Sequence, residues 1–379
     1  MSKEKPLIAL LTNNDDDVFC FRKELIDGIL AEGYEMLISC PYGEKFELMK
    51  EYTYRYDDPV IDRRGTSVVK DFGLLLHYFR LFGKHRPDVI LTYTAKPGVY
   101  GSIAAKLRGI PYINNVTGFG SVLSKTGLMR RIIMGLFRFA YRGAECIMFQ
   151  NAVNMKLAQE IGMVKGEHRL IPGSGVALDR YPVQPYPDGG NGMEGEIVRF
   201  NYFGRIMHEK GVDDYIECAR RIRKKYPRTE FHMCGFIEPT ESHYESDLKK
   251  LGDEGIVIYH GSQKDVKPFI ANAHAIIHPS TYGEGMSNVL LENASSGRPL
   301  ITTDNPGCRE TVEEGKNGFI YTGGNGEELI AAVEKFLAMP NDERRRMGLE
   351  GRAKVEREFD RQTVVRAYLE QIGKILNQR

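Results

Sequence analysis

A chain of 379 residues is too long for one ordinary hydrophobic core and suits two domains of about 170–190 residues each. Its hydrophobic content of 42%, charged content of 27% and formal net charge of +1 are ordinary for a soluble globular protein. The near-neutral balance, and a basic segment without a nucleic-acid-binding motif, exclude nucleic acid as the expected partner. Six scattered cysteines without C-x2-C spacing predict free thiols and neither a disulfide framework nor a zinc site.

The amino-terminal residues carry no apolar stretch of the kind that a signal peptide has. Nowhere in the chain does an apolar run reach the ~18 residues needed to span a bilayer. We therefore expect a cytoplasmic protein.

Strands and helices alternate along the first half of the chain. A helix is expected from Phe21 to Ala31, because its apolar residues recur at helical spacing and Gly33 follows. This alternation predicts a doubly wound parallel sheet between helices, an α/β fold. The expected strands cover residues 7–11, 35–39, 89–92, 112–116, 147–149 and 170–171.

The second half repeats the alternation after a change in composition. Residues 182–195 are rich in Pro, Gly, Tyr and Asp without periodicity, which is typical of an interdomain linker. We therefore predict a first domain over residues 1–181, a second over 196–358 and a terminal amphipathic helix over 359–379. The second domain is expected to begin with a strand from Ile197, followed by strands at 231–233, 256–259, 275–278 and 300–302.

Two carboxylates eight residues apart flank the turn that follows the expected strand Ala275–His278. Glu284 lies in the loop, and Glu292 lies two turns along a helix expected from Ser287. At 1.5 Å rise per residue the two acids are roughly 10–12 Å apart, too far to share a proton. They suit the two ends of an elongated ligand with hydroxyl groups; the alternative is a loop acid and a solvated helix glutamate.

Two cations, Arg205 and Lys210, follow another expected strand and Gly204. They precede a helix expected from Val212, so they lie in the loop at the carboxyl end of a strand, where open α/β sheets bind ligands. An arginine guanidinium can donate two parallel hydrogen bonds to phosphate oxygens, and a lysine ammonium adds a positive charge. The alternative is a solvated basic loop.

The interval from Val89 to Ala144 contains no acidic residue. Within it, residues 128–142 fit an amphipathic helix with Arg130, Arg131, Arg138 and Arg142 opposite the apolar face. Such a pattern predicts contact of residues 125–142 with an anionic membrane. The alternative is a helix packed on its own domain, with the arginines solvated or bound to phosphates.

These motifs, in this order, resemble the signatures of retaining GT-B glycosyltransferases of family 4. The resemblance rests on Gly204-Arg205 with Lys210-Gly211 and on Pro279-Ser280 with Glu284-Gly285 and Glu292; it also includes 171–176, 305–310 and 317–319. It implies two Rossmann-like domains facing a central cleft, with the terminal helix crossing back to the first domain.

The resemblance also implies roles for these residues. Arg205 and Lys210 would bind the diphosphate of a nucleotide sugar, Glu292 the ribose hydroxyls and Glu284 the sugar. The remaining substrate-binding positions would be Gly204, Gly285, Met286, Ser287, Asn288 and Glu310. Cations in place of Mg²⁺ make a metal unnecessary, and we expect neither a metal nor a cofactor. The acidic run Asp15–Asp17 follows the first expected strand and could suggest a metal site. We interpret it as an acceptor-side loop or as a solvated turn.

Retention of configuration would follow from the family, by front-face attack with the departing phosphate as base. Many relatives have a histidine in the first domain, but residues 114–120 contain none, which leaves Thr117 and the Gly118 amide as candidates. The expected reaction transfers a hexose or N-acetylhexosamine from a UDP-sugar to a polyprenyl-diphosphate-linked saccharide at the inner membrane face. Alternatives are a nucleotide-sugar epimerase, a phosphorylase with pyridoxal phosphate, or a non-catalytic partner subunit.

Overall fold

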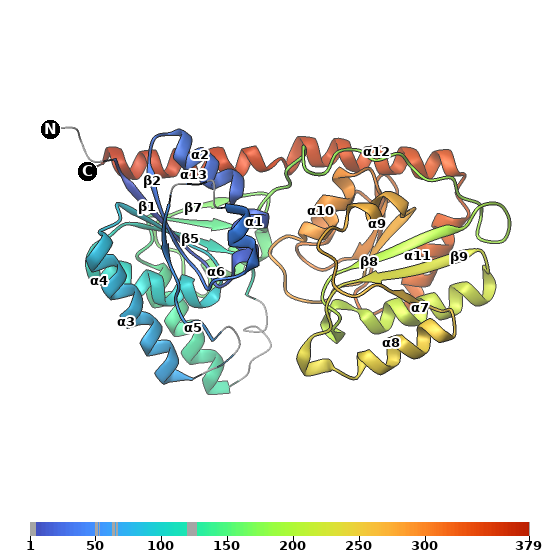
Figure 1. Cartoon of the computed structure of the whole chain (residues 1–379), viewed down its shortest axis with the longest axis horizontal. Helices are drawn as coiled ribbons and strands as arrows, with labels where there is room; N and C mark the ends of the chain where they lie inside the picture. The colour runs from blue at the N-terminus through green and yellow to red at the C-terminus, as the bar shows by residue number, and fades with distance from the viewer. Residues whose placement is uncertain are drawn as a thin grey trace. The chain divides into compact units, whose positions relative to one another are not determined.

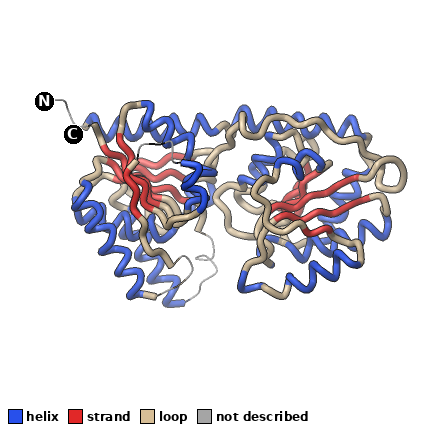
Figure 2. The backbone as a smooth tube through the Cα atoms, viewed as in Figure 1, coloured by secondary structure: helices blue, strands red, loops and turns tan. Residues whose placement is uncertain are grey.

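The chain folds into two compact units, each built on its own parallel sheet (Figures 1 and 2). The computed structural model describes residues 5–49, 52, 54–62, 65, 67–119 and 127–378, apart from the side chains of residues 128 and 129. Unit 1 comprises Met1–Gly175 and Arg361–Arg379, and unit 2 comprises Val176–Asp360. The expected α/β class with two Rossmann-like units is confirmed.

Unit 1 has a seven-stranded parallel sheet in the order β3-β2-β1-β4-β5-β6-β7. The central strands are short, mostly apolar and largely buried on both faces, as parallel sheets require. The register pairs Ala9 with Leu37 and Leu10 with Leu91. The strands are β1 (Leu7–Leu11), β2 (Glu35–Ser39), β3 (Arg55–Asp57), β4 (Val89–Thr92), β5 (Tyr112–Val116), β6 (Cys146–Phe149) and β7 (Glu167–Leu170).

Helices cover both faces of this sheet, because alternate residues of each strand point to opposite sides. Leu7, Ala9 and Leu11 face a core formed with α3, α4 and α5, whereas Ile8 and Leu10 face a core formed with α2 and α13 (Figure 1). The helices are α1 (Asp15–Phe21), α2 (Lys23–Ala31), α3 (Val68–His85), α4 (Ser102–Arg108), α5 (Gly127–Tyr141), α6 (Ala152–Glu160) and α13 (Arg361–Asn377).

Unit 2 has a six-stranded parallel sheet in the order β10-β9-β8-β11-β12-β13. The order reverses between β8 and β11, and at such a reversal open α/β sheets bind ligands beyond the carboxyl ends of the strands. The strands are β8 (Val198–Phe203), β9 (Thr229–Cys234), β10 (Ile258–Tyr259), β11 (Ala275–His278), β12 (Leu300–Thr303) and β13 (Gly318–Tyr321). The helices are α7 (Val212–Lys225), α8 (Tyr244–Asp253), α9 (Lys267–Asn272), α10 (Asn288–Ser295), α11 (Gly326–Leu337) and α12 (Asn341–Glu358).

Several elements differ from the sequence-based expectation. The helix expected over 21–31 is present as α2, which begins at Lys23, and a further helix that was not expected, α1, ends at Phe21 just before it. The strands β3 and β13 were not predicted. Strand β7 lies at 167–170, not at the expected 170–171. It is an edge strand in which charged residues interrupt the apolar pattern. The run Asp15–Asp17 is the first turn of α1 rather than a loop, and Asp17 is buried, where it accepts a 2.7 Å hydrogen bond from the Thr12 hydroxyl.

The connections between the units also lie elsewhere than expected. The chain passes between units at Gly175–Val176 and again at Asp360–Arg361, so residues 176–195 belong to unit 2. Residues 182–195 form neither helix nor strand, but they are held to unit 2 by side chains distant in sequence. The fully buried Arg298 and Arg344 donate to the carbonyls of Pro185 (2.7 Å) and Gly190 (2.8 Å). Composition alone cannot reveal such long-range partners.

His274 fixes the same segment through both ring nitrogens. Its Nε2 lies 3.0 Å from the Asp188 carbonyl, and its Nδ1 accepts a 3.0 Å hydrogen bond from the Arg199 amide. This pattern requires the neutral ring, because an Nδ1 proton would oppose the amide proton. Burial accordingly lowers the pKa of His274 to about 4, from an ordinary value of 6.5.

We predict that the free energy of unfolding decreases as pH falls from about 6.5 to about 4, by about 3 kcal/mol from this side chain alone. Between these two pH values His274 is protonated in the unfolded chain and neutral in the native state. Urea unfolding at a series of pH values measures the effect. His274→Gln should flatten the dependence and the exposed His243→Gln should retain it; identical profiles for wild type and His274→Gln would contradict the assignment.

Candidate functional site

The residues singled out in unit 2 gather where the loops after β8 and β11 meet. Gly211 has a φ of +72°, and a Cβ atom there would overlap the Pro279 carbonyl, so the close approach of the two loops requires glycine. The Thr281 amide also donates a 3.0 Å hydrogen bond to the Glu209 carbonyl. Backbone contacts thus bring Lys210 and Glu284 together across 74 residues of sequence.

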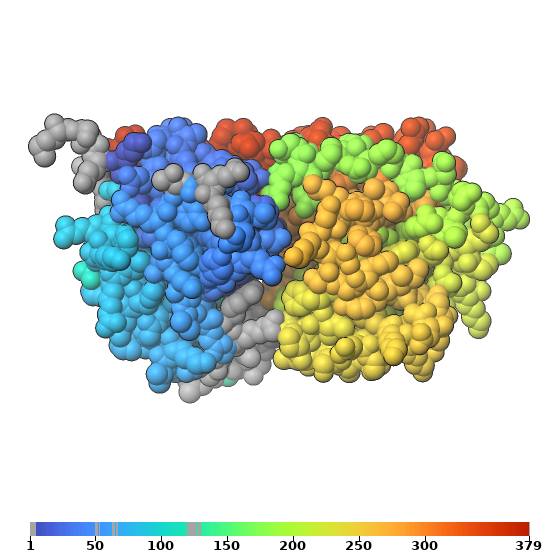
Figure 3. Space-filling view, in the orientation of Figure 1, coloured from blue at the N-terminus to red at the C-terminus, as the bar shows by residue number. Residues whose placement is uncertain are grey.

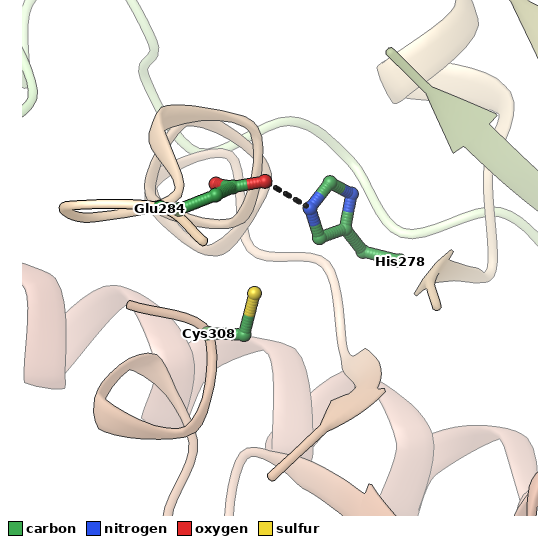
Figure 4. A group of neighbouring side chains, drawn as sticks. All are labelled: His278, Glu284 and Cys308. Carbon is green, nitrogen blue, oxygen red and sulfur yellow. Dashed lines mark ion pairs between the residues drawn. The ribbon is translucent and has the colours of Figure 1, made fainter. Parts of the chain in front are cut away.

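Lys210 and Glu284 form an ion pair at this junction. The Lys210 Nζ donates to Glu284 Oε1, which also accepts a 3.1 Å hydrogen bond from the Ser280 hydroxyl. The two side chains are only 12% and 11% exposed. His278, at the end of β11, points toward the same carboxylate with its Nε2 3.6 Å from Oε1 (Figure 4).

The surroundings keep Glu284 ionised. Burial by itself would raise the pKa of the carboxyl, but the Lys210 ammonium and the His278 ring more than offset this and hold the pKa well below its ordinary value. One lysine N–H is directed at Glu284, and a lysine has three. The pair therefore presents a fixed carboxylate and a cation with donors to spare.

Arg205 adds a second cation beside the first. Its guanidinium lies 5.2 Å from the centre of the Tyr282 ring, and the Lys210 ammonium lies 5.1 Å from the same ring. Arg205 Nη1 lies 3.3 Å from Glu238 Oε2, while 30% of the arginine side chain stays exposed. One aromatic ring thus orients two cations, and the exposed part of Arg205 can bind an anion such as phosphate.

The segment from Gly285 to Asn288 leads into α10. The Ser287 amide donates a 2.8 Å hydrogen bond to the Gly307 carbonyl, and its hydroxyl lies 3.2 Å from His278 Nε2. Met286 is buried in the core beneath, and α10 begins at Asn288. The segment is therefore fixed to the β11 end on one side and to the loop after β12 on the other.

Three further predicted residues occupy distinct positions. The Glu310 carboxylate accepts a 2.7 Å hydrogen bond from the Gly307 amide, so it shapes the loop that supports Ser287. Glu292 lies half-buried in the second turn of α10. Gly204 follows β8 directly, with its amide 3.1 Å from the Cys234 carbonyl of the neighbouring β9. Their roles toward a ligand remain predictions.

Thr117 and Gly118 lie in unit 1, directly after β5. They occupy the carboxyl edge of the first sheet, and Gly118 has a φ of +115°. The assembly around Lys210 and Glu284 in unit 2 therefore forms without them.

The sequence analysis missed three residues of the site. His278 ends a strand in the sequence pattern, and a histidine directly before the motif loop is a usable signal. Glu238 follows β9, so its proximity to Arg205 depends on the pairing of β8 with β9. Tyr282 lies in the motif loop between Ser280 and Glu284, and the motif pattern assigns it no role.

His278, Glu284 and Cys308 bring three potential metal-binding atoms within 4.8 Å of one another (Figure 4). The residues do not fit a divalent ion well. Lys210 already neutralises the Glu284 oxygen nearest His278, and the Ser287 hydroxyl lies at His278 Nε2. Burial raises the pKa of the Cys308 thiol far above its ordinary value, which keeps the sulfur protonated.

Comparison with known proteins agrees with this geometry. The sequence model of the family "Glycosyl transferases group 1" matches residues 194–354, and that of "Glycosyl transferase 4-like" matches residues 8–151. The chain is 25% identical over 338 residues to the capsular polysaccharide biosynthesis glycosyltransferase CapM of Staphylococcus aureus, covering 83% of this chain and 84% of CapM.

A second relative extends over nearly the whole chain. It is the N,N'-diacetylbacillosaminyl-diphospho-undecaprenol alpha-1,3-N-acetylgalactosaminyltransferase of Campylobacter jejuni, 22% identical over 388 residues, with 97% of this chain and 99% of the relative covered. Among solved structures, HepE of Anabaena in complex with UDP and glucose shares the fold with a TM-score of 0.78 at 19% identity, covering 97% of this chain and all of HepE.

The two parallel-sheet units, one with its polar cluster at a switch point, agree with the class of protein that the family matches define. The chain belongs to the GT-B glycosyltransferases of family 4.

We predict that Lys210→Ala lowers the free energy of unfolding by about 3 kcal/mol, because it leaves the Glu284 carboxylate buried without its cation. Adding Glu284→Gln to that variant should restore part of the loss, and a double-mutant cycle in urea measures the coupling. Lys335→Ala, which breaks an exposed pair with Glu314, serves as the control and should change stability by less than about 0.5 kcal/mol. Strictly additive effects at Lys210 and Glu284 would contradict a coupled pair.

Proposed function

We propose that the protein transfers a hexose or N-acetylhexosamine from a UDP-sugar to a saccharide on polyprenyl diphosphate, with retention of configuration. The product would enter a surface polysaccharide or a lipid-linked glycan. The pair of Lys210 and Glu284 beside Arg205, at the switch point of a glycosyltransferase fold, is the observation that carries the proposal. The capsule enzyme and the diphospho-undecaprenol transferase among the relatives support the acceptor class, and UDP in HepE supports the donor.

The two cations suit the leaving group of such a donor. Bond cleavage shifts negative charge onto the nucleoside diphosphate, so cations already in place stabilise the transition state more than the ground state. Arg205 and Lys210 are held by Tyr282 and Glu284 before any ligand binds, so little reorganisation is needed. Glu292 in α10 would accept hydrogen bonds from the ribose hydroxyls.

Glu284 suits the sugar itself. An ionised carboxylate only accepts hydrogen bonds, and sugar hydroxyls are donors that match it. The amides from Gly285 to Asn288 would bind the same sugar, and the departing phosphate would accept the proton of the acceptor hydroxyl. On this proposal Arg205 and Lys210 do the electrostatic work of a divalent ion, so the reaction needs neither a metal nor a cofactor.

The acceptor would bind unit 1, with Thr117 and Gly118 at the carboxyl edge of its sheet. Within the described part of the chain, no helix combines the length and apolar composition that a bilayer-spanning segment needs. We propose instead a peripheral contact with the inner membrane face through α5. Arg130, Arg131 and Arg138 are exposed there, and so are 50% of Ile132 and 52% of Phe139.

The proposal predicts release of UDP from one UDP-sugar, in the presence of EDTA, that depends on a polyprenyl-diphosphate-linked saccharide. A panel of UDP- and GDP-sugars with and without acceptor measures it, and the anomeric configuration of the product tests retention. Loss of activity in EDTA that Mg²⁺ restores would refute metal independence. Conversion of the sugar without release of nucleotide would indicate an epimerase instead.

Glu284→Gln and Lys210→Ala should each lower kcat by about 10²–10³-fold, the effect of removing one preorganised electrostatic group. Steady-state kinetics on the donor found above measures the loss. Lys335→Ala and Glu314→Gln, exposed residues of the same unit, should keep wild-type rates. Near-normal turnover in Glu284→Gln or Lys210→Ala would remove that residue from the mechanism.

A further inference from the structure

Each of the two cations that follow β8 has a carboxylate partner on the loop after a neighbouring strand. In the sheet of unit 2, β8 lies between β9 and β11 (Figure 1). Lys210 pairs with Glu284, which follows β11, and Arg205 Nη1 lies 3.3 Å from Oε2 of Glu238, which follows β9. The segments that carry the two carboxylates adjoin at the surface of unit 2, where Figure 3 shows them in yellow and orange. Residues 204–211, called the cation loop below, are therefore held from both sides.

Glu238 differs from Arg205 in its access to a ligand. The Glu238 side chain is only 4% exposed, whereas 30% of the Arg205 side chain beside it is exposed. A ligand can thus contact the guanidinium, and the carboxylate lies behind it under cover of the protein. Glu238 acts on a bound anion through its own charge or through the orientation of Arg205, and these two routes can be separated.

The loop after β9 is fixed by backbone contacts that do not involve the Glu238 carboxylate. The parallel pairing of β8 with β9 continues past both strands: the Ile206 amide donates a 2.9 Å hydrogen bond to the Phe236 carbonyl, and the Glu238 amide donates a 3.0 Å hydrogen bond to the Ile206 carbonyl. A Cβ atom at Gly235 would overlap the Gly204 carbonyl, so the two backbones also touch there. The ion pair with Arg205 is therefore additional to the contacts that hold the loop.

The backbone of the cation loop is fixed as well, which leaves the Arg205 side chain as its adjustable part. The Tyr202 hydroxyl donates a 2.6 Å hydrogen bond to the Arg205 carbonyl, and the His208 amide donates a 2.7 Å hydrogen bond to the Glu241 carboxylate. An arginine side chain has several rotatable bonds, so a fixed backbone does not by itself orient the guanidinium. Tyr282 lies against its face, and Glu238 supplies the contact at one edge.

The charge of Glu238 alone does not favour an anion at this site. A carboxylate beside a phosphate-binding cation lowers the local positive charge, and its burial is unfavourable without a partner. The contact instead gives direction, because a carboxylate that accepts from one edge of the planar guanidinium fixes where its other N–H groups point. Donors that are already oriented stabilise developing charge without reorganisation during the reaction.

We propose that Glu238 is a positioning residue, which fixes the Arg205 guanidinium through Nη1 and directs its remaining N–H groups at the diphosphate of the donor. This inference rests on the proposed function for the identity of the anion, whereas the contact between the two side chains does not depend on it. The loop after β9 then belongs to the site, although the motif residues lie on the loops after β8 and β11.

A second arginine–glutamate contact between the same two strands provides the matched control. Arg199 Nε lies 2.9 Å from Glu230 Oε2, and the register places these residues opposite each other near the amino ends of β8 and β9. Ligands bind beyond the carboxyl ends of such strands. Replacing Glu230 therefore removes the same charge and the same kind of contact at a distance from the cation loop.

The test compares Glu238→Ala with Glu238→Gln. Both remove one negative charge, but only glutamine keeps an oxygen that can accept a hydrogen bond from Arg205. We expect Glu238→Ala to bind UDP about tenfold more weakly than Glu238→Gln and to have a kcat about tenfold lower, because the orienting contact is lost. Titration calorimetry with UDP and steady-state kinetics measure the two effects. Glu230→Ala should bind UDP as the wild type does.

A double-mutant comparison shows whether Glu238 acts through Arg205. Arg205→Ala/Glu238→Ala and Arg205→Ala/Glu238→Gln should bind UDP equally, because the side chain to be oriented is gone. A difference that persists in this background would overturn the proposal, since a general effect on the loop would then explain it. Equal UDP binding and equal kcat in Glu238→Ala and Glu238→Gln would overturn it too, and so would an equal loss in Glu230→Ala.

Failure of the proposed function is distinguishable from failure of this inference. If the wild type binds UDP but transfers no sugar, the proposed function fails, and the comparison of UDP binding still decides the role of Glu238. If it binds inorganic pyrophosphate but not UDP, the UDP-sugar donor is wrong, and the same comparison made with pyrophosphate decides. Binding of neither compound would overturn the anion site and this inference with it.

Discussion

The ion pair of Lys210 with Glu284 is the interaction on which the candidate site depends. It joins the loops that follow two neighbouring strands, β8 and β11, at the one point of the sheet where strand order reverses. A buried carboxylate is unfavourable without a cation, so Lys210 stabilises the ionised form of Glu284. Arg205, Tyr282 and His278 are arranged around this pair.

The rest of unit 2 supports that pair by fixing backbone rather than by adding charge. Gly211 allows the two loops to touch, and Glu310 holds the loop that in turn holds Ser287. Farther away, Arg298 and Arg344 bind carbonyl groups of an extended segment to the same unit. Buried arginines take this role well, because five donors in a rigid fork can satisfy several carbonyls at once.

Unit 1 differs from unit 2 in its exposed surface, where charged and large apolar side chains lie on the same helices. Helix α3 exposes a row of cations and a row of apolar side chains side by side, and α5 exposes arginines with Ile132 and Phe139. Both helices are anchored by ordinary amphipathic packing on one face of the sheet. One unit thus carries fixed charges in a tight polar cluster, and the other carries charged and apolar side chains on the exposed faces of two helices.

Much of this architecture could be predicted from the residues. Short, mostly apolar runs identified β1, β2, β4, β5 and β11 at their observed bounds, since strands buried on both faces are largely apolar. The motif order placed Arg205, Lys210 and Glu284 in loops at strand ends. Strands with charged or few residues, β3 and β7, escaped that rule because they lie at the sheet edges and are partly solvated.

Sequence alone therefore determined the α/β class, the family and the residue types of the site, because these are encoded in local patterns and spacing. Only the tertiary structure decided which of those residues meet. The contact of Lys210 with Glu284, of Arg205 with Glu238 and of Arg298 with residues 184–185 each depends on strand order and on loops far apart in the chain. Helix α3 has both buried and exposed apolar residues, and periodicity alone does not separate the two. Its packing against the sheet shows which of them are covered.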